Sequence, residues 1–73
     1  MDSNLLNVFV EVANQKSISK AALNLGFAQS NVTSRIQQLE KSLEICLFHR
    51  VPKGVILTPE GEKLYSYAVE IVK

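Results

Sequence analysis

The spacing of apolar residues predicts a first helix over residues 3–14. Its main apolar face is formed by Leu5, Leu6, Phe9, Val12 and Ala13. Val8 and Val10 lie outside this face, so the helix is apolar on more than one side. A helix of this kind has a second surface to bury, and we predict that Val8 lies against another subunit.

The central part of the chain, residues 17–40, predicts two helices joined by a sharp turn. Ser17 is the preferred N-cap of the first helix, and Gly26 between the helices is free to adopt a positive φ. The second helix begins at Gln29, which places Ala28, a poor capping residue, at its N-cap. Its apolar stripe is formed by Val32, Ile36, Leu39 and Leu43. A short helix, a glycine turn and a second helix form the helix-turn-helix pattern.

Opposite its apolar stripe, the second helix carries a polar face that is almost uncharged. An ordinary solvated helix face carries interspersed Glu and Lys residues. Ser, Asn, Thr and Gln side chains suit contacts with base edges and phosphates in a DNA major groove. We therefore predict a recognition helix at about 29–40, although a plain surface helix of a small all-α domain is the alternative. The predicted DNA contacts from this helix are Gln29, Ser30, Asn31, Thr33, Ser34, Arg35 and Gln38.

A change to β-prone residues follows the two helices. Two short runs, 47–50 and 55–57, are joined by a loop that contains Pro and Gly, which predicts a hairpin. A basic hairpin after a helix-turn-helix is typical of a wing. Arg50 would then contact the DNA backbone, and Lys53 at the tip of the wing (about 50–55) would enter the minor groove. A purely structural hairpin with solvated charges is the alternative.

The last predicted helix begins after Thr58, a favoured N-cap, and runs to Lys73. One apolar stripe, predicted to pack on the domain, is formed by Leu64, Ala68 and Ile71. The other stripe, predicted to pack on a partner subunit, is formed by Tyr65, Val69 and Val72. These elements predict a mainly α fold: three helices and a two-stranded β wing over residues 1–58, a winged helix-turn-helix domain, followed by a helix over 59–73 that packs on a partner subunit.

Composition and charge fit a small DNA-binding domain. The 73 residues are 47% hydrophobic, enough for one compact core. Residues 16–53 hold six Lys and Arg residues against two Glu, a net charge of +4, whereas the rest of the chain carries −3. A basic patch on an otherwise balanced chain is an electrostatic signature of nucleic-acid binding, although chance clustering also gives it. The N-terminus lacks a signal peptide and no stretch is long enough to span a membrane, so we expect a cytoplasmic protein.

Other functional classes have weaker support in the sequence. Cys46 is the only cysteine, and its apolar neighbours predict a buried thiol. Cys46 and His49 have the spacing of two metal ligands, but a metal site needs more, so we predict no metal and no cofactor. A protein-interaction module would use the same apolar stripes without needing a basic wing. The sequence offers no acid–base pair, activated nucleophile or phosphate-binding loop, which argues against an enzyme.

The whole chain resembles the N-terminal DNA-binding domain of LysR-type transcriptional regulators. Order and spacing agree without a gap over essentially the entire sequence. The matching positions are Leu6, Phe9, Val12, Ala13, Ser17, Ile18, Ser19, Ala21, Ala22, Leu25, Gln29, Val32, Arg35, Ile36, Leu39, Glu40, Leu47, Phe48, Arg50, Lys53, Gly54, Val55, Leu57, Thr58 and Gly61.

The resemblance implies a bacterial regulator, held at the nucleoid by DNA, that binds double-stranded DNA as a homodimer or tetramer at interrupted inverted repeats. It also implies that the helix over 59–73 is the start of a dimerising linker helix, and that a larger C-terminal domain, absent from this chain, binds a small-molecule effector. The chain departs from the family pattern at Ala28, Ser30, Asn31 and Glu44, where the family often has Ser, Pro, a small residue and Gly. Since Ser30 and Asn31 lie on the predicted reading face, we expect them to alter the DNA sequence that is recognised.

Overall fold

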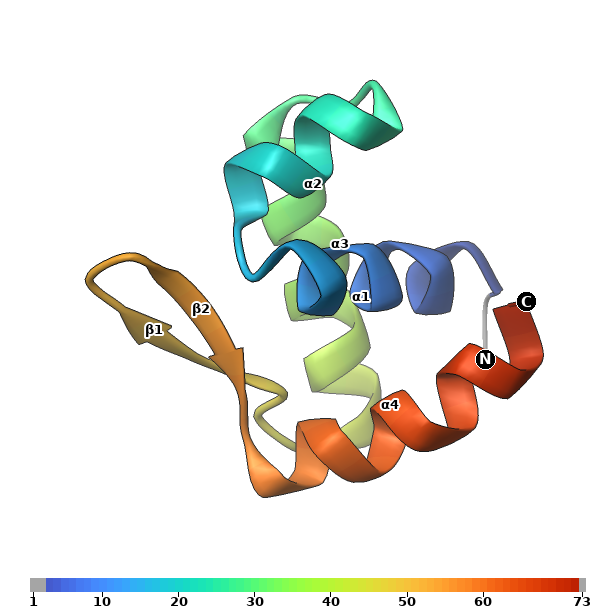
Figure 1. Cartoon of the computed structure of the whole chain (residues 1–73). Coiled ribbons are helices and arrows are strands. Elements are labelled where there is room, and N and C mark those ends of the chain that lie inside the picture. Colours follow the sequence, from blue (N-terminus) through green and yellow to red (C-terminus); the bar gives the residue numbers. More distant parts are fainter. Residues whose placement is uncertain (1–2, 73) are drawn as a thin grey trace.

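The computed structural model describes residues 3–72. The elements are α1 (Ser3–Gln15), α2 (Ile18–Leu25), α3 (Gln29–Leu43), β1 (Phe48–Val51), β2 (Gly54–Leu57) and α4 (Pro59–Val72). The strands form a two-stranded antiparallel sheet, and the rest of the fold is helical (Figure 1). The predicted winged helix-turn-helix followed by a further helix is confirmed, although the predicted end at Lys73 lies outside the described residues.

Helix α1 lies at the centre of the domain and packs against α2, α3 and α4 (Figure 1). Its buried residues therefore occupy a broad arc, a little more than half of the helix circumference: Leu5, Leu6, Val8, Phe9, Val10 and Val12. The second apolar surface that the sequence shows is covered by helices of the same chain. The prediction that Val8 lies in a subunit interface is wrong, because its side chain is only 1% exposed within the single subunit.

The turn between α2 and α3 is set by its backbone. Ser17 caps α2 as predicted, since its hydroxyl oxygen accepts the Lys20 N–H at 3.1 Å. Gly26 ends α2 in the left-handed region at φ 73°, and the Phe27 N–H donates to the Ala22 carbonyl at 2.9 Å. The turn brings α3 back across α1 and exposes the opposite side of α3.

Helix α3 ends in the same kind of turn without a glycine. Glu44 adopts the left-handed conformation at φ 58°, and its N–H donates to the Glu40 and Lys41 carbonyls. Although the family pattern often has Gly at this position, Glu44 keeps the turn geometry of a glycine cap. The Glu40 carboxylate also accepts the Leu47 N–H at 2.6 Å, which ties the chain entering the wing to α3.

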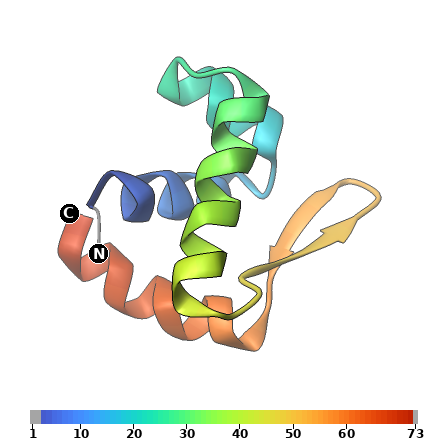
Figure 2. The ribbon, with the colours of Figure 1, turned by 180° about the vertical axis from the view of Figure 1, so that it is seen from behind.

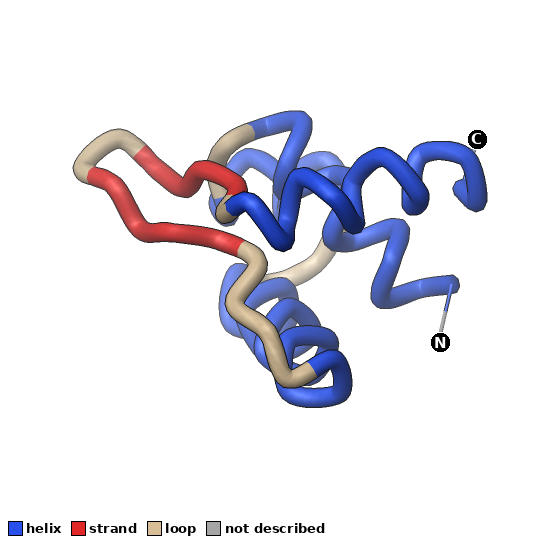
Figure 3. The backbone as a smooth tube through the Cα atoms, turned by 90° about the horizontal axis from the view of Figure 1, so that it is seen from below, coloured by secondary structure: helices blue, strands red, loops and turns tan. Residues whose placement is uncertain are grey.

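The wing is longer and its turn tighter than the sequence predicts. The strands pair from Phe48 opposite Leu57 to Val51 opposite Gly54, which leaves a turn of two residues instead of four. The Phe48 ring contacts the core at Phe9, with ring centroids 5.4 Å apart. From this base the two strands project beyond the helices (Figure 3).

The wing is also fastened to the rest of the domain through its backbone. The Val55 N–H donates to the Lys16 carbonyl at 3.1 Å, just before the helix-turn-helix begins. At the foot of the wing, the buried Thr58 hydroxyl donates to the Cys46 carbonyl at 2.6 Å and accepts the Gly61 N–H at 2.9 Å. Thr58 is therefore the predicted cap of α4 and also a link between the two ends of the hairpin.

Candidate nucleic-acid interface

The predicted reading face lies on the exposed side of α3. Val32, Ile36 and Leu39 are buried, and the polar residues opposite them on the helix are mostly exposed. Figure 2 shows α3 lying in front of α1, with no other element over its outer side. Thr33 and Arg35 are half-buried at the two edges of this side. The exposed members of the predicted set are Gln29, Ser30, Asn31, Ser34 and Gln38.

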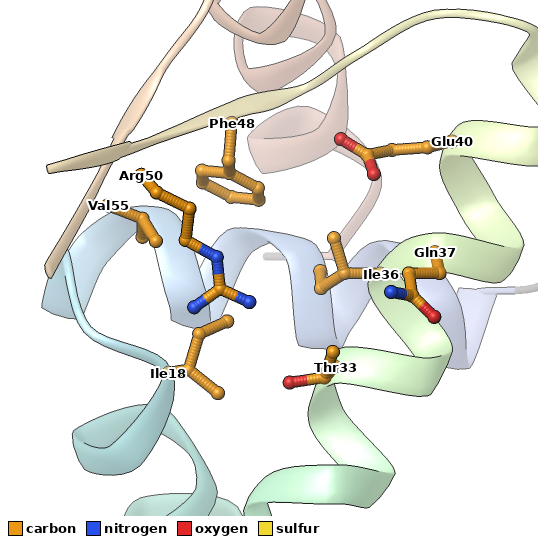
Figure 4. A pocket seen from close by; sticks show the side chains of 8 residues that line it. All are labelled: Ile18, Thr33, Ile36, Gln37, Glu40, Phe48, Arg50 and Val55. Carbon is orange, nitrogen blue, oxygen red and sulfur yellow. The ribbon is translucent and has the colours of Figure 1, made fainter.

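One edge of the reading face meets the wing. A small cavity of about 140 Å³ lies where α3, the start of α2 and the sheet converge (Figure 4). Its lining residues are Ile18, Thr33, Ile36, Gln37, Glu40, Phe48, Arg50 and Val55. Arg50 lies two residues after Phe48, so both side chains leave the strand on the side of α3. The exposed guanidinium of Arg50 extends toward Ile18 and Thr33, beside the reading face (Figure 4).

The other edge of the reading face lies away from the wing. Asn31, Arg35 and Gln38 line an open concavity there, together with Leu5, Ala28, Ser30 and Ser34. Arg35 is already engaged within the chain. Its Nε donates to Asn31 Oδ1 at 2.6 Å, and its guanidinium carbon lies 4.9 Å from the centre of the Phe27 ring. The structure thus separates Arg35 from Arg50, with Ser30 and Ser34 between them.

The predicted set of DNA contacts omits Gln37, which the structure places beside the wing. Gln37 is exposed and lines the wing-side cavity one helical turn after Thr33. The sequence places Gln37 four residues after Thr33, and therefore on the same edge of α3. Only the position of the wing shows that this edge faces Arg50.

Two further features complete the interface. Lys53 lies in the exposed two-residue turn at the tip of the wing. At the other end, Ala28 makes no side-chain hydrogen bond to the first turn of α3. Backbone N–H groups at a helix N-terminus, reinforced by the helix dipole, can bind a phosphate. The exposed polar side of α3 is therefore flanked by cationic groups on the wing and by the partial positive charge of its own N-terminus.

The outer side of α4 differs from the prediction. Ala68 is buried as expected, but Ile71, predicted to pack on the domain, is 61% exposed. Tyr67 is 71% exposed one turn earlier. Tyr65 and Val69 are half-buried and pack against the core of their own chain, and the side chain of Val72 lies outside the described residues. The stripe assignment fails because the buried side of α4 lies between the two predicted stripes, with Ala68 buried and Leu64, Tyr65 and Val69 half-buried.

Cys46 is exposed, so the prediction of a buried thiol is wrong. Its Sγ donates to the Phe48 carbonyl at 3.4 Å at the edge of the loop. Among residues 3–72, no group of three or more His, Cys, Asp or Glu side chains is arranged to hold a metal ion. Within the same residues, none of the helices has the length and apolar character needed to cross a bilayer.

Comparison with known proteins assigns the family. Residues 3–62 match the model of the family described as bacterial regulatory helix-turn-helix protein, lysR family. The HTH-type transcriptional regulator GltR of Bacillus subtilis (strain 168) is 53% identical over 72 residues, which are 99% of this chain and 24% of GltR. The HTH-type transcriptional regulator YofA of Bacillus velezensis is 51% identical over 73 residues, 100% of this chain and 25% of YofA. The chain thus spans about a quarter of the length of these relatives.

Solved structures share the fold. The BenM DBD in complex with catB site 1 DNA has a TM-score of 0.94 and 39% identity, covering 99% of this chain and 81% of that chain. The CbnR DBD–DNA complex has a TM-score of 0.94 and 30% identity, covering 99% of this chain and 83% of that chain. Both curated relatives are transcriptional regulators by name, in agreement with the prediction of a non-enzymatic domain. The chain therefore belongs to the LysR family of bacterial regulatory proteins, and it has the winged helix-turn-helix fold of the DNA-binding domain of that family.

Proposed function

We propose that the chain binds duplex DNA sequence-specifically, with the exposed side of α3 in a major groove and the wing at the adjacent minor groove. The observation that carries this proposal is the almost uncharged polar side of α3, with Arg50 of the wing beside it and Lys53 at the tip of the wing. Side chains of this kind read base edges, while flanking cations bind phosphates. The structural likeness to BenM and CbnR domains in complex with DNA supports it.

The proposed contacts fall into two groups by their chemistry. Residues of α3 discriminate among bases, and each well-formed bidentate contact is worth about 1–3 kcal/mol. Arg50 and Lys53 supply affinity that falls as salt rises, because phosphate neutralisation releases counterions. The α3 residues proposed to face the groove or its phosphates are Gln29, Ser30, Asn31, Thr33, Ser34, Gln37 and Gln38.

Removing the charge of Lys53 tests the wing contact. Lys53→Gln is expected to weaken binding to duplex DNA and to reduce the slope of log affinity against log salt by about 0.9. Fluorescence anisotropy titrations at several salt concentrations measure both quantities. The matched control is Lys63→Gln on α4, also exposed but away from the proposed interface, and it should leave the slope near wild type. Equal slopes for Lys53→Gln and the wild-type chain would rule out the wing contact.

We propose that two copies pair through the outer side of α4, which places two α3 helices on the half-sites of an inverted repeat. The exposed Tyr67 and Ile71 lie one turn apart on this helix and offer an apolar surface to a partner. Tyr65 and Val69, the predicted interface residues, would lie at its margin, since both also pack on their own core.

Placing a charge in this surface tests the pairing. Ile71→Glu is expected to convert a dimer into a monomer without unfolding the domain, because the side chain is exposed in the single subunit. Sedimentation equilibrium measures the assembly state. Ser66→Glu adds the same charge on another exposed part of α4 and should leave the dimer intact. A dimer that persists in Ile71→Glu would place the interface elsewhere.

The regulatory setting follows from the relatives. We propose that the chain serves a transcriptional regulator acting in the bacterial cytoplasm, and that any effector binds outside these residues. Support comes from the regulators it resembles, of whose length it spans about a quarter.

A further inference from the structure

Three side chains at the start of α3 form a continuous chain of contacts. The Phe27 ring, in the turn before α3, lies under the guanidinium of Arg35 at 4.9 Å. Arg35 Nε in turn donates to Asn31 Oδ1 at 2.6 Å, four residues earlier on the helix. Arg35 is half-buried and Asn31 is exposed, so the contacts run from the turn out to the reading face.

This arrangement fixes the orientation of the Asn31 carboxamide. An arginine Nε can only donate, so the Asn31 atom that faces it must be the carbonyl oxygen. The amide nitrogen, with two N–H donors, then points away from Arg35. The carbonyl oxygen keeps a second lone pair, because Arg35 occupies only one. Asn31 therefore still offers the acceptor and donor needed to pair with N6 and N7 of adenine.

We infer that Arg35 is a positioning residue, which holds Asn31 ready to read one adenine in each half-site and does not itself contact DNA. This rests on the proposed function. The Nε–H and one face of the guanidinium are committed to Asn31 and to the Phe27 ring, so only the Nη N–H groups of Arg35 remain for another partner. Arg35 also lies at the edge of α3 away from Arg50, the arginine of the wing.

Pre-orientation has a measurable consequence. A free asparagine side chain loses rotamer freedom when it binds a base, whereas the ordered Asn31 has lost it in advance. Loss of Arg35 should therefore weaken binding by about three- to tenfold. The loss should fall on discrimination at the base pair that Asn31 reads, and should leave the number of neutralised phosphates unchanged.

The test uses this chain and a duplex that the wild-type chain selects from a random-sequence pool. Binding of each variant is measured against the selected duplex and against duplexes with one base pair changed, at several salt concentrations. Asn31→Ala identifies the adenine, as the one position where discrimination disappears. Arg35→Gln is then expected to reduce discrimination at that same position and to keep the wild-type salt slope. The double variant should be no worse than Asn31→Ala alone.

Two further variants separate position from charge. Arg35→Lys keeps the charge but lacks Nε, so it should lose discrimination as Arg35→Gln does. Lys41→Gln removes an exposed charge from the same helix and should leave discrimination at the adenine intact. Circular dichroism confirms that each variant is folded.

The outcomes decide between the two roles of Arg35. A salt slope that falls by about 0.9 in Arg35→Gln and recovers in Arg35→Lys would show a phosphate contact and overturn the inference. Additive losses in the double variant would overturn it too, as would unchanged discrimination in Asn31→Ala. If the wild-type chain selects no sequence at all, the proposed function itself fails, which is a distinct result.

Discussion

Ser34→Glu is expected to weaken binding to duplex DNA by at least about 100-fold, while the domain keeps its fold. Ser34 is exposed on α3 between the wing-side edge and the edge occupied by Arg35. In the proposed complex, a carboxylate there faces base edges and phosphates from which water is excluded. Like charges brought together in this way cost several kcal/mol. Folding should be unaffected because glutamate favours helices at least as well as serine.

A control on the same helix separates this local effect from a change in net charge. Ser42→Glu adds the same negative charge at an exposed position two turns later and outside the proposed contact set. Its affinity for DNA should fall only slightly, through long-range repulsion that salt screens. Anisotropy titrations of both variants with one duplex make the comparison. Similar losses in the two variants would mean that the polar side of α3 is not the reading face.

Gly54→Ala is expected to lower the free energy of unfolding by about 2–4 kcal/mol and to detach the wing. A Cβ at Gly54 would lie 2.1 Å from the Lys16 carbonyl oxygen, and the backbone there has φ 147°, a conformation that other residues rarely adopt. Relief of the clash requires the wing to move away from Lys16, which breaks the Val55 N–H bond to that carbonyl. Since Arg50 and Lys53 move with the wing, the salt slope of DNA binding should fall by about 1.8.

Gly26→Ala is the matched control for Gly54→Ala. Gly26 also has a positive φ, 73°, but a Cβ there would meet no atom within 4 Å. Its cost should therefore be the conformational strain alone, about 1–2 kcal/mol. Urea unfolding measures the stability of both variants. A loss in Gly54→Ala no larger than that in Gly26→Ala would show that contact with Lys16 does not hold the wing.

The sequence predicts the elements well because each leaves a local signal. Ser17, Gly26 and Thr58 are capping or turn residues whose preferences depend on neighbouring backbone, and all three act as predicted. The wrong predictions concern helix surfaces whose burial depends on how the helices pack together. The apolar sides of α1 suggest a partner subunit, but a single sequence does not tell whether a second surface is buried by the same chain or by another. Val8 and Ile71 are misassigned for this reason.

The candidate site is predicted from the sequence to about the same extent as the fold. Helical periodicity identifies the polar side of α3, and the charge of residues 16–53 points to nucleic acid. Which side chains act together depends on distances between elements. Arg50 lines a cavity with Ile18 and Thr33 only because the wing folds back toward α3. The engagement of Arg35 with Phe27 likewise depends on the path of the turn, which no residue pattern specifies.

The central claim is that this domain reads a DNA sequence with α3, and selection from a random-sequence pool tests it most directly. The wild-type chain and the Ser34→Glu variant are each taken through several rounds of duplex selection at physiological salt. The wild-type chain should enrich a short common sequence, repeated in inverted orientation where two copies bind, and the variant should enrich none. A wild-type pool that stays random, or a variant that enriches the same sequence, would contradict the assignment of α3 as the recognition helix.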